Sequence, residues 1–205
     1  MNYDSLCKII TNISDIMTAN KDYLIELDQQ NGDGDLGISM SAGYEAVKEF
    51  VLASEERDLG KLLMKCSSVF NEAAPSSLGT ITSFGFMGMA KALKGKQEAT
   101  LAEVGEALDA GLNKIMDKAG SKPGEKTILD ALYPAIEVIK ASAEGDTVEV
   151  LKAAAEAAAK GSEDTKNMRS VHGRAAYYAE KSIGTLDGGS VVGKLIFEAV
   201  YNSYC

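Results

Sequence analysis

The most chemically informative part of the chain is an acidic loop with the sequence DQQNGDGDLG over residues 28–37. Its three carboxylates, Asp28, Asp33 and Asp35, fall within eight positions and are interspersed with glycines that permit a tight backbone turn. Like charges this close repel one another unless a cation neutralises them. Oxygen ligands without nearby histidine or cysteine suit Mg²⁺ or Ca²⁺ rather than zinc, so the loop is a candidate site for a hard divalent cation.

Two cations and one structural alternative compete for this loop. A calcium-binding EF-hand that began at Asn31 would need glycine at its sixth position and glutamate at its twelfth, where the chain has Leu36 and Ala42. Mg²⁺ binds through a few carboxylates together with the phosphates of a substrate, which fits a loop that leads into a helix N-terminus. The alternative is a solvated Asp/Gly turn that caps the next helix, and the spacing alone leaves the magnesium site and the turn both open.

The composition limits the classes of protein to which the chain can belong. With 205 residues, 45% of them hydrophobic and 25% charged, it has enough apolar material for the core of one globular domain. Its formal net charge of −9 argues against broad binding to nucleic acid or anionic membranes. No apolar run is long enough to cross a membrane, the N-terminus does not resemble a signal peptide, and the three cysteines are scattered. We therefore expect a single cytoplasmic domain over residues 1–205.

The elements that position the acidic loop are expected to be α-helices. Alanine, leucine, glutamate, lysine and methionine dominate long stretches, and the alternation typical of strands is hardly seen. Eight segments show apolar residues at helical spacing: Leu6–Met17, Gly37–Leu52, Lys61–Phe70, Ser83–Leu93, Thr100–Ile115, Glu125–Ser142, Asp146–Lys160 and Ser190–Tyr201. A capping box at Thr100 marks the start of the fifth, the sixth is expected to bend at Pro134, and the seventh could continue past a break near Gly161 through Tyr177 and Tyr178. This pattern predicts an all-α, eight-helix antiparallel up-and-down bundle or barrel.

Four of the connections between these helices are rich in Gly, Asp, Ser or Pro. They are Asp28–Gly37, Ala74–Thr80, Gly120–Lys126 and Gly184–Ser190. They follow the first, third, fifth and seventh helices, and alternate connections of an up-and-down bundle lie at the same end. We therefore expect the four loops to converge on one rim, with the ligand site there.

The acidic loop is the first of several motifs that occur in a fixed order along the chain. After Leu27–Gly37 come Pro123–Leu132 with the sequence PGEKTILDAL, Gly173–Tyr177 with GRAAY, Glu180–Gly184 with EKSIG, and Leu186–Gly189 with LDGG. Together, and with their spacing, they resemble the nucleotide-binding L subunit (DhaL) of bacterial dihydroxyacetone kinases over essentially the whole chain. Several separated motifs in order are much more specific than any one of them.

The resemblance implies an eight-helix antiparallel barrel with an adenine nucleotide, ADP or ATP, held at its rim mainly through Mg²⁺. Asp28, Asp33 and Asp35 would be the magnesium ligands that bridge the phosphates. The nucleotide contacts that the resemblance implies are Leu36, Gly37, Ser39, Ser76, Ser77, Gly79, Thr80, Ala119, Ile128, Arg174, Asp187, Gly188 and Gly189. Among these, Ala119 and Ile128 would pack against the adenine.

Some of these residues have a structural alternative. Ser76 and Ser77 could cap the helix that follows them, and Arg174 could form a salt bridge at the rim instead of binding phosphate. Lys126, which also matches a family position, is interpreted as a surface or structural lysine. His172, the only histidine, is interpreted as a surface residue, with a phosphohistidine carrier as the alternative.

The chain departs from the family pattern at the expected rim. Leu36 stands where the family usually has histidine, and Ser39 stands where it usually has asparagine. The glycine-rich turn is replaced by Ala73–Gly79, and the last motif continues as DGGS over Asp187–Ser190. The acidic residues and Arg174 are retained, so metal and phosphate binding are expected. Whether ADP stays bound or exchanges with free ATP is left open.

The resemblance also implies a phosphotransferase that is active only with a partner. A K-type subunit would hold a short ketose that accepts the phosphoryl group, and an M-type phosphoprotein of the phosphotransferase system would recharge the ADP in place. The nearest alternative is an ATP-dependent kinase of the same superfamily that acts on another small ketose. A nucleotide-dependent regulatory binding module and a metal-stabilised bundle without activity are further alternatives, and the oligomeric state, a homodimer included, is left open.

Overall fold

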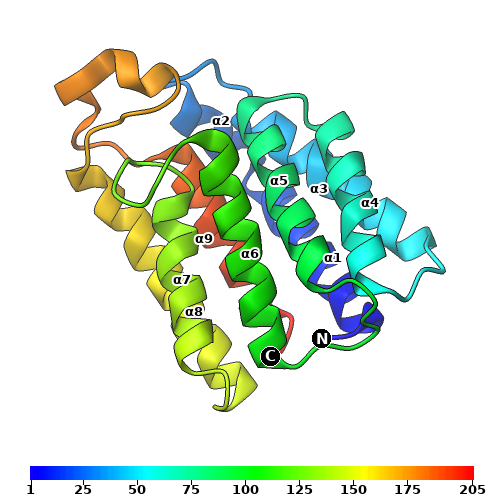
Figure 1. Cartoon of the computed structure of the whole chain (residues 1–205). Coiled ribbons are helices and arrows are strands. Elements are labelled where there is room, and N and C mark those ends of the chain that lie inside the picture. The colour runs from blue at the N-terminus through cyan, green and yellow to red at the C-terminus, as the bar shows by residue number, and fades with distance from the viewer.

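The structure, a computed structural model, describes residues 1–205 and is built almost entirely of helices (Figure 1). Its helices are α1 (Tyr3–Ala19), α2 (Lys21–Asp28), α3 (Leu36–Ala53), α4 (Leu59–Ala73), α5 (Ser77–Ala92), α6 (Leu101–Ala119), α7 (Leu129–Ala141), α8 (Thr147–Asp164), the 3-10 segments η1 (Thr165–Asn167) and η2 (Arg174–Ser182), and α9 (Gly188–Asn202). The only β-type pairing is an isolated bridge between Asn2 and Glu98. The all-α prediction is therefore confirmed.

The α-helices are arranged as the staves of a closed barrel. From α3 to α9 each helix packs against the next one along the chain, α1 packs against α3, and α9 returns to α1. The short helix α2, which the sequence did not predict, follows α1 after a break at Asn20, so that the two helices form one stave. The eight predicted staves are thus present, and both termini lie at the lower end in Figure 1.

Apolar side chains hold the staves together. The rings of Tyr44 and Phe70 meet edge to face with centroids 4.8 Å apart, and Phe86 packs against both. Helix α3 approaches α4 closely at Gly43, where a Cβ atom would lie 2.6 Å from Phe70 Cζ. The centre of the barrel retains a cavity of about 280 Å³, and 23 of its 27 lining residues are hydrophobic. A site for a polar ligand must therefore lie at an end of the barrel.

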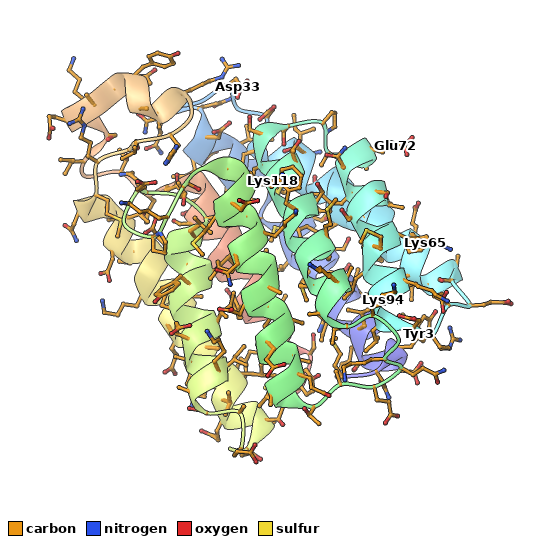
Figure 2. All side chains as sticks on the ribbon, in the orientation of Figure 1. Tyr3, Asp33, Lys65, Glu72, Lys94 and Lys118 are labelled. Carbon is orange, nitrogen blue, oxygen red and sulfur yellow. The ribbon has the colours of Figure 1, made fainter.

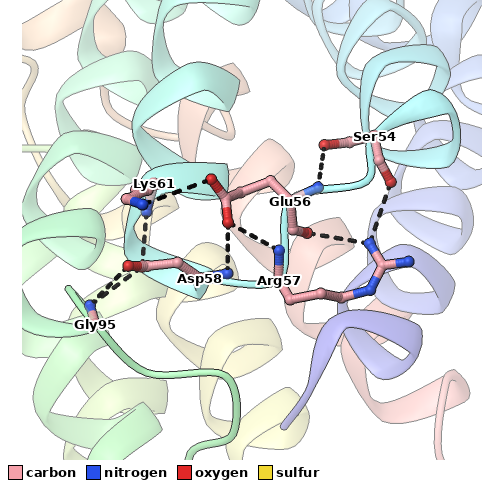
Figure 3. A network of polar contacts seen from close by, with 6 residues as sticks. All are labelled: Ser54, Glu56, Arg57, Asp58, Lys61 and Gly95. Carbon is pink, nitrogen blue, oxygen red and sulfur yellow. Dashed lines mark hydrogen bonds and ion pairs between the residues drawn. The ribbon is translucent and has the colours of Figure 1, made fainter.

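Hydrogen bonds close the end of the barrel that carries the termini (Figure 3). Asp58 caps α4 by accepting a hydrogen bond from Lys61 N, and the same carboxylate accepts from Gly95 N in the α5–α6 connection, all at 3.1 Å. Glu56 accepts from the backbone N–H groups of Arg57 and Asp58. The bonds from Gly95 N to Asp58 tie the α3–α4 connection to the α5–α6 connection, and the others stabilise the α3–α4 connection itself.

The predicted start of the sixth helix is wrong, because α7 begins at Leu129 and not at Glu125. The preceding loop contains two left-handed residues, Gly124 at φ 92° and Lys126 at φ 61°, which a helix cannot include. The Asp130 carboxylate stabilises this loop by accepting from Gly124 N at 2.5 Å. Residues before Leu129 therefore form a turn that is anchored to the first turn of α7.

The predicted helical continuation after α8 is also wrong. Residues 165–187 contain only the 3-10 segments η1 and η2, and the backbone leaves the helical region at Gly173 (φ 64°) and Ala179 (φ 47°). The exposed Tyr177 and Tyr178 lie on η2 and do not face the barrel core. This part of the chain crosses the rim outside the ring of staves (Figure 1).

The remaining local predictions have mixed outcomes. The capping box at Thr100 is present, because its side chain accepts from Glu103 N and the Glu103 carboxylate accepts from Thr100 N. Helix α5 begins at Ser77, earlier than the predicted Ser83, because the Ser76 side chain caps it. None of the helices combines the length and the apolar character that a bilayer crossing requires.

Candidate functional site

A polar cavity of about 710 Å³ opens at the end of the barrel remote from the termini. Its lining comes mainly from residues 27–36, 76–81, 118–128, 170–175 and 186–189. All four of the loops that were expected to converge contribute to it, and only 10 of its 30 lining residues are hydrophobic. In Figure 2, Asp33 and Lys118 lie towards this end, whereas Tyr3 and Lys94 lie towards the other. The loops therefore do meet at one rim.

Three carboxylates of the acidic loop converge at the cavity. Ligand oxygens of Asp28, Asp33 and Asp35 all lie within 4.8 Å of one another. Asp28 also accepts a hydrogen bond from Gly34 N at 2.8 Å, which fixes its orientation within the loop. A Cβ atom at Gly32 would collide with the Asp28 carboxylate, so the tight approach of the loop requires glycine there. The donor set, three carboxylates without histidine or cysteine, fits Mg²⁺.

The electrostatics of this cluster favour a cation. Partial burial and the neighbouring charges of Asp33 and Asp28 raise the pKa of Asp35, and Arg174 opposes this effect. The Arg174 guanidinium forms an ion pair with Asp33, with Nη2 and Oδ2 at 2.7 Å. One arginine facing three carboxylates leaves the cluster with a net negative charge. The rim salt bridge considered for Arg174 therefore exists, and it places the guanidinium beside the carboxylates.

Three α-helices begin at the wall of this cavity. α3 begins at Leu36, α5 at Ser77 and α9 at Gly188, and all three residues line it. The first N–H groups of a helix lack partners within the helix, and the helix dipole makes this end positive, so it is a favourable place for phosphate. The Ser76 hydroxyl caps α5 by accepting from Gly79 N at 3.0 Å, whereas Asp35 makes no side-chain cap bond to α3. The first turn of α3 therefore keeps its N–H groups available.

Asp187 lies at the wall of the cavity and caps α9. Its Oδ2 accepts from Ser190 N at 2.6 Å. Burial, together with the charges of Asp130 and Asp28, raises the pKa of Asp187 to about 7, although the hydrogen bond from Ser190 N and the charge of Lys126 act in the opposite direction. Near neutral pH, both the protonated and the ionised form of Asp187 are therefore populated.

Residues 30–202 match the family model described as the DAK2 domain. The chain belongs to the DAK2 domain family. This DAK2 domain is 30% identical over 183 residues to the ADP-binding subunit DhaL of the PEP-dependent dihydroxyacetone kinase of Escherichia coli, a match that covers 88% of the chain and 87% of the relative. It is also 30% identical over 203 residues to the ADP-binding subunit DhaL of PEP-dependent dihydroxyacetone kinase 1 of Listeria innocua, covering 98% and 97% of the two chains.

The fold of this DAK2 domain is also found in a solved structure. The crystal structure of the dihydroxyacetone kinase from C. freundii in complex with AMP-PNP and Mg²⁺ superimposes with a TM-score of 0.77 at 25% sequence identity. The alignment covers 96% of the present chain and 33% of that kinase, so the DAK2 domain spans about a third of its length.

All but two of the residues predicted for the site line the cavity of this DAK2 domain. Those that line it are Asp28, Asp33, Asp35, Leu36, Ser39, Ser76, Ser77, Thr80, Ala119, Ile128, Arg174, Asp187, Gly188 and Gly189. Gly37 and Gly79 do not. A Cβ atom at Gly37 would collide with the carbonyl of Lys21, and one at Gly79 would collide with that of Ala74. Both glycines therefore let the first turns of α3 and α5 pack closely against neighbouring backbone.

Several cavity residues were not anticipated from the sequence. Lys126 is only 5% exposed, so the interpretation as a surface lysine is wrong and the structural one is retained. His172 is half-buried at the cavity and pairs with Glu125, with Nε2 and Oε2 at 2.6 Å. Ser121 and Ser170 are buried in the cavity wall. Lys126 belongs to a recognised motif, but none of these residues has a local sequence pattern that predicts its burial.

Proposed function

We propose that this DAK2 domain is the nucleotide-bearing subunit of a dihydroxyacetone-type kinase. It would transfer a phosphoryl group from a magnesium-bound adenine nucleotide to a hydroxyl of a short ketose that a separate K-type subunit holds. The observation that carries the proposal is the meeting of three carboxylates, three helix N-termini and one arginine in a single polar cavity. The DhaL relatives support ADP as the nucleotide.

Each group of site residues would have a distinct task. Asp28, Asp33 and Asp35 would hold Mg²⁺, which when bound neutralises phosphate charge and orients the transferred group. The open first turn of α3 would donate N–H groups to phosphate oxygens. Arg174 would turn from Asp33 towards a phosphate, where its planar guanidinium can donate two hydrogen bonds. The backbone and side chains of this acidic protein would thus supply the positive potential locally.

The remaining cavity residues would hold the nucleoside. Ile128 directly precedes α7 and Ala119 ends α6; both line the cavity, so both could offer apolar surface to an adenine ring. Ser77 and Thr80 are exposed on the first turn of α5 and present hydroxyl groups to the ribose or to phosphate. Gly188 and Gly189, which carry no side chain, would let the start of α9 approach the ligand closely.

The acceptor sugar is assigned to a partner because this chain has no suitable side chain for it. The only histidine, His172, pairs with Glu125 at 2.6 Å and is not placed to form a covalent adduct with a carbonyl group. Exposed apolar side chains also gather beside the cavity on residues 171–183, with Tyr177 being 89% exposed. Such exposed apolar groups are typical of surfaces that dock a partner. We therefore infer that the K-type subunit approaches this rim.

The source of the phosphoryl group is a further part of the proposal. Because the E. coli and Listeria relatives are PEP-dependent kinases, we infer that an M-type phosphoprotein recharges ADP while it stays bound. We further infer that residues 1–205 act as one domain. The cytoplasmic location expected from the sequence stays a prediction.

Mass spectrometry of small molecules released from the purified protein tests the proposal. ADP should co-purify, should survive gel filtration with Mg²⁺, and should be released by a chelator. The loaded protein should then pass phosphate to dihydroxyacetone only when a K subunit is added. Retained ADP that free ATP does not displace would support the phosphoprotein relay, and rapid exchange would support an ATP-dependent kinase. A protein that binds neither ADP nor ATP in the presence of Mg²⁺ would refute the proposal.

A further inference from the structure

Lys126 is a buried cation whose hydrogen-bond partners are all backbone carbonyls. Its Nζ donates to Met168 O at 3.3 Å, to Ser182 O at 2.6 Å and to Thr185 O at 2.7 Å. None of these contacts is with a carboxylate, and Asp187 acts on Lys126 only through its charge. An ammonium group has three N–H donors, and all three are used here. Although Lys126 lines the cavity, it therefore has no donor left for a phosphate.

The three carbonyls belong to one segment, residues 168–185, which we call the strap. Met168 lies where the strap leaves the barrel, and Ser182 and Thr185 lie where it returns. Between these points Ser170 is buried in the cavity wall, but no residue of η2 before Ser182 is buried. Lys126 thus holds both ends of the strap against the loop that precedes α7.

The strap carries Arg174, the one arginine that faces the carboxylate cluster. The ion pair between Arg174 and Asp33 is largely exposed, and exposed ion pairs contribute little to fixing a segment. The His172–Glu125 pair adds a second contact near the same point of the strap. The bonds from Lys126 are buried and charge-assisted, so they are the strongest attachment of the strap to the barrel.

The backbone at Lys126 indicates that this residue type is required there. Its φ of 61° lies in the left-handed region, where glycine is favoured and a lysine is strained. Burial of the ammonium adds a desolvation cost, which also lowers the pKa of Lys126. A glycine would remove both the backbone strain and the cost of burying an ammonium group, but it could not make the three hydrogen bonds.

We propose that Lys126 is a positioning residue for nucleotide binding, which acts by pinning both ends of the strap so that Arg174 is held over the acidic loop. The proposal rests on the proposed function in that the ligand is Mg²⁺ with ADP. Lys126 does not touch the ligand, and its effect on binding passes through Arg174.

The test compares Lys126→Met, Arg174→Gln and the double variant, with Lys122→Met as a control in which an exposed lysine of the same loop is changed. Isothermal titration with ADP and Mg²⁺ should show binding about tenfold or more weaker for Lys126→Met, as expected for loss of charge-assisted hydrogen bonds. Arg174→Gln should weaken binding by a similar factor. The dissociation constant of the double variant should lie within about twofold of that of the single variant that binds more weakly, because Lys126 acts only through Arg174. Lys122→Met should bind as the unchanged protein does.

Amide hydrogen exchange of the nucleotide-free protein provides a second, independent measurement. Lys126→Met should increase exchange across residues 168–185 while α3 to α6 stay protected. If Lys126→Met does not fold, Lys126→Gly keeps the left-handed backbone without strain and should give the same two results. Unchanged ADP affinity, or losses that multiply in the double variant, would overturn the proposal. If the unchanged protein does not bind ADP, the proposed function fails, and unaltered exchange of the strap would then overturn the positioning role separately.

Discussion

Replacement of Asp35 by asparagine should stabilise the metal-free protein and at the same time abolish its response to Mg²⁺ and ADP. The change removes one charge and keeps the shape of the side chain. Oxygens of Asp35, Asp33 and Asp28 lie within 4.8 Å of one another, and Coulomb's law at that distance gives about 1 kcal/mol per pair in water and about 3.5 kcal/mol at an effective dielectric of 20. Because Asp35 is exposed, the lower value applies to each of its two pairs.

Two effects oppose this gain. Arg174 offsets part of the repulsion, and a negative charge at the start of α3 is worth about 0.3–1 kcal/mol through the helix dipole. The net gain for Asp35→Asn is then about 1 kcal/mol, which corresponds to a rise in Tm of about 2–4 °C for a chain of this size. The sign is opposite to that of most substitutions, which destabilise.

Without ligand, Asp35→Asn should have the higher Tm; with ligand, the unchanged protein should have the higher Tm. With ADP and Mg²⁺ at 100 times the dissociation constant, the unchanged protein should gain about 2.7 kcal/mol of stability. Because Asp35 is one of the three proposed magnesium ligands, Asp35→Asn should lose this gain. Differential scanning fluorimetry with and without ligand measures both effects, and Glu26→Gln, an exposed acid on α2, is the control with the same change in charge. A variant with a lower Tm in the absence of metal and an undiminished ligand shift would refute the assignment of Asp35 as a ligand.

Three other substitutions test the barrel and its rim. Gly43→Ala should lower stability by about 1–3 kcal/mol, because the new Cβ would lie 2.6 Å from Phe70 Cζ, and chemical denaturation should show recovery when Phe70→Leu is added. Asp58→Ala should lower Tm by a few degrees through loss of the α4 cap and of the bond from Gly95 N. Because these backbone bonds lower the pKa of Asp58, the difference in Tm between the variant and the unchanged protein should disappear as the pH falls below the range in which this carboxylate ionises. In urea titrations, Asp187→Asn should leave the free energy of unfolding nearly unchanged at pH 4 and raise it by up to about 4 kcal/mol at pH 8. The reason is that the pKa of Asp187 is raised to about 7 in the folded protein, so the unchanged protein loses stability as the pH rises from about 4 to about 7.

The parts of the fold that were predicted correctly are those in which local sequence determines the structure. The capping box at Thr100 and the regular apolar spacing of the staves depend on residues within a few positions of one another. The start of α7 was missed because Lys126 adopts a left-handed conformation that its residue type disfavours. That conformation is stabilised by carbonyls 42 to 59 positions away, which no local pattern can reveal.

The candidate site divides in the same way. The carboxylate cluster was predictable because Asp28, Asp33 and Asp35 are close in sequence, and one tight loop brings their oxygens within 4.8 Å of one another. The burial of Lys126 and the pairing of His172 with Glu125 were not predictable, because each depends on where residues 168–185 cross the rim. Tyr177 and Tyr178 resembled a helical continuation, but the strap leaves them exposed.

The site therefore combines two kinds of structural support. The helix N-termini at Leu36, Ser77 and Gly188 are parts of packed staves, so their positive potential is fixed by the stability of the barrel. The guanidinium of Arg174 lies instead on the strap, which the barrel holds mainly through one buried ammonium. Changes in the barrel core should consequently alter the unfolding free energy with little effect on intrinsic ligand affinity, whereas changes in the strap should alter affinity with little effect on global unfolding. The position of the cation at the rim therefore depends on the attachment of the strap and not on the packing of the barrel core.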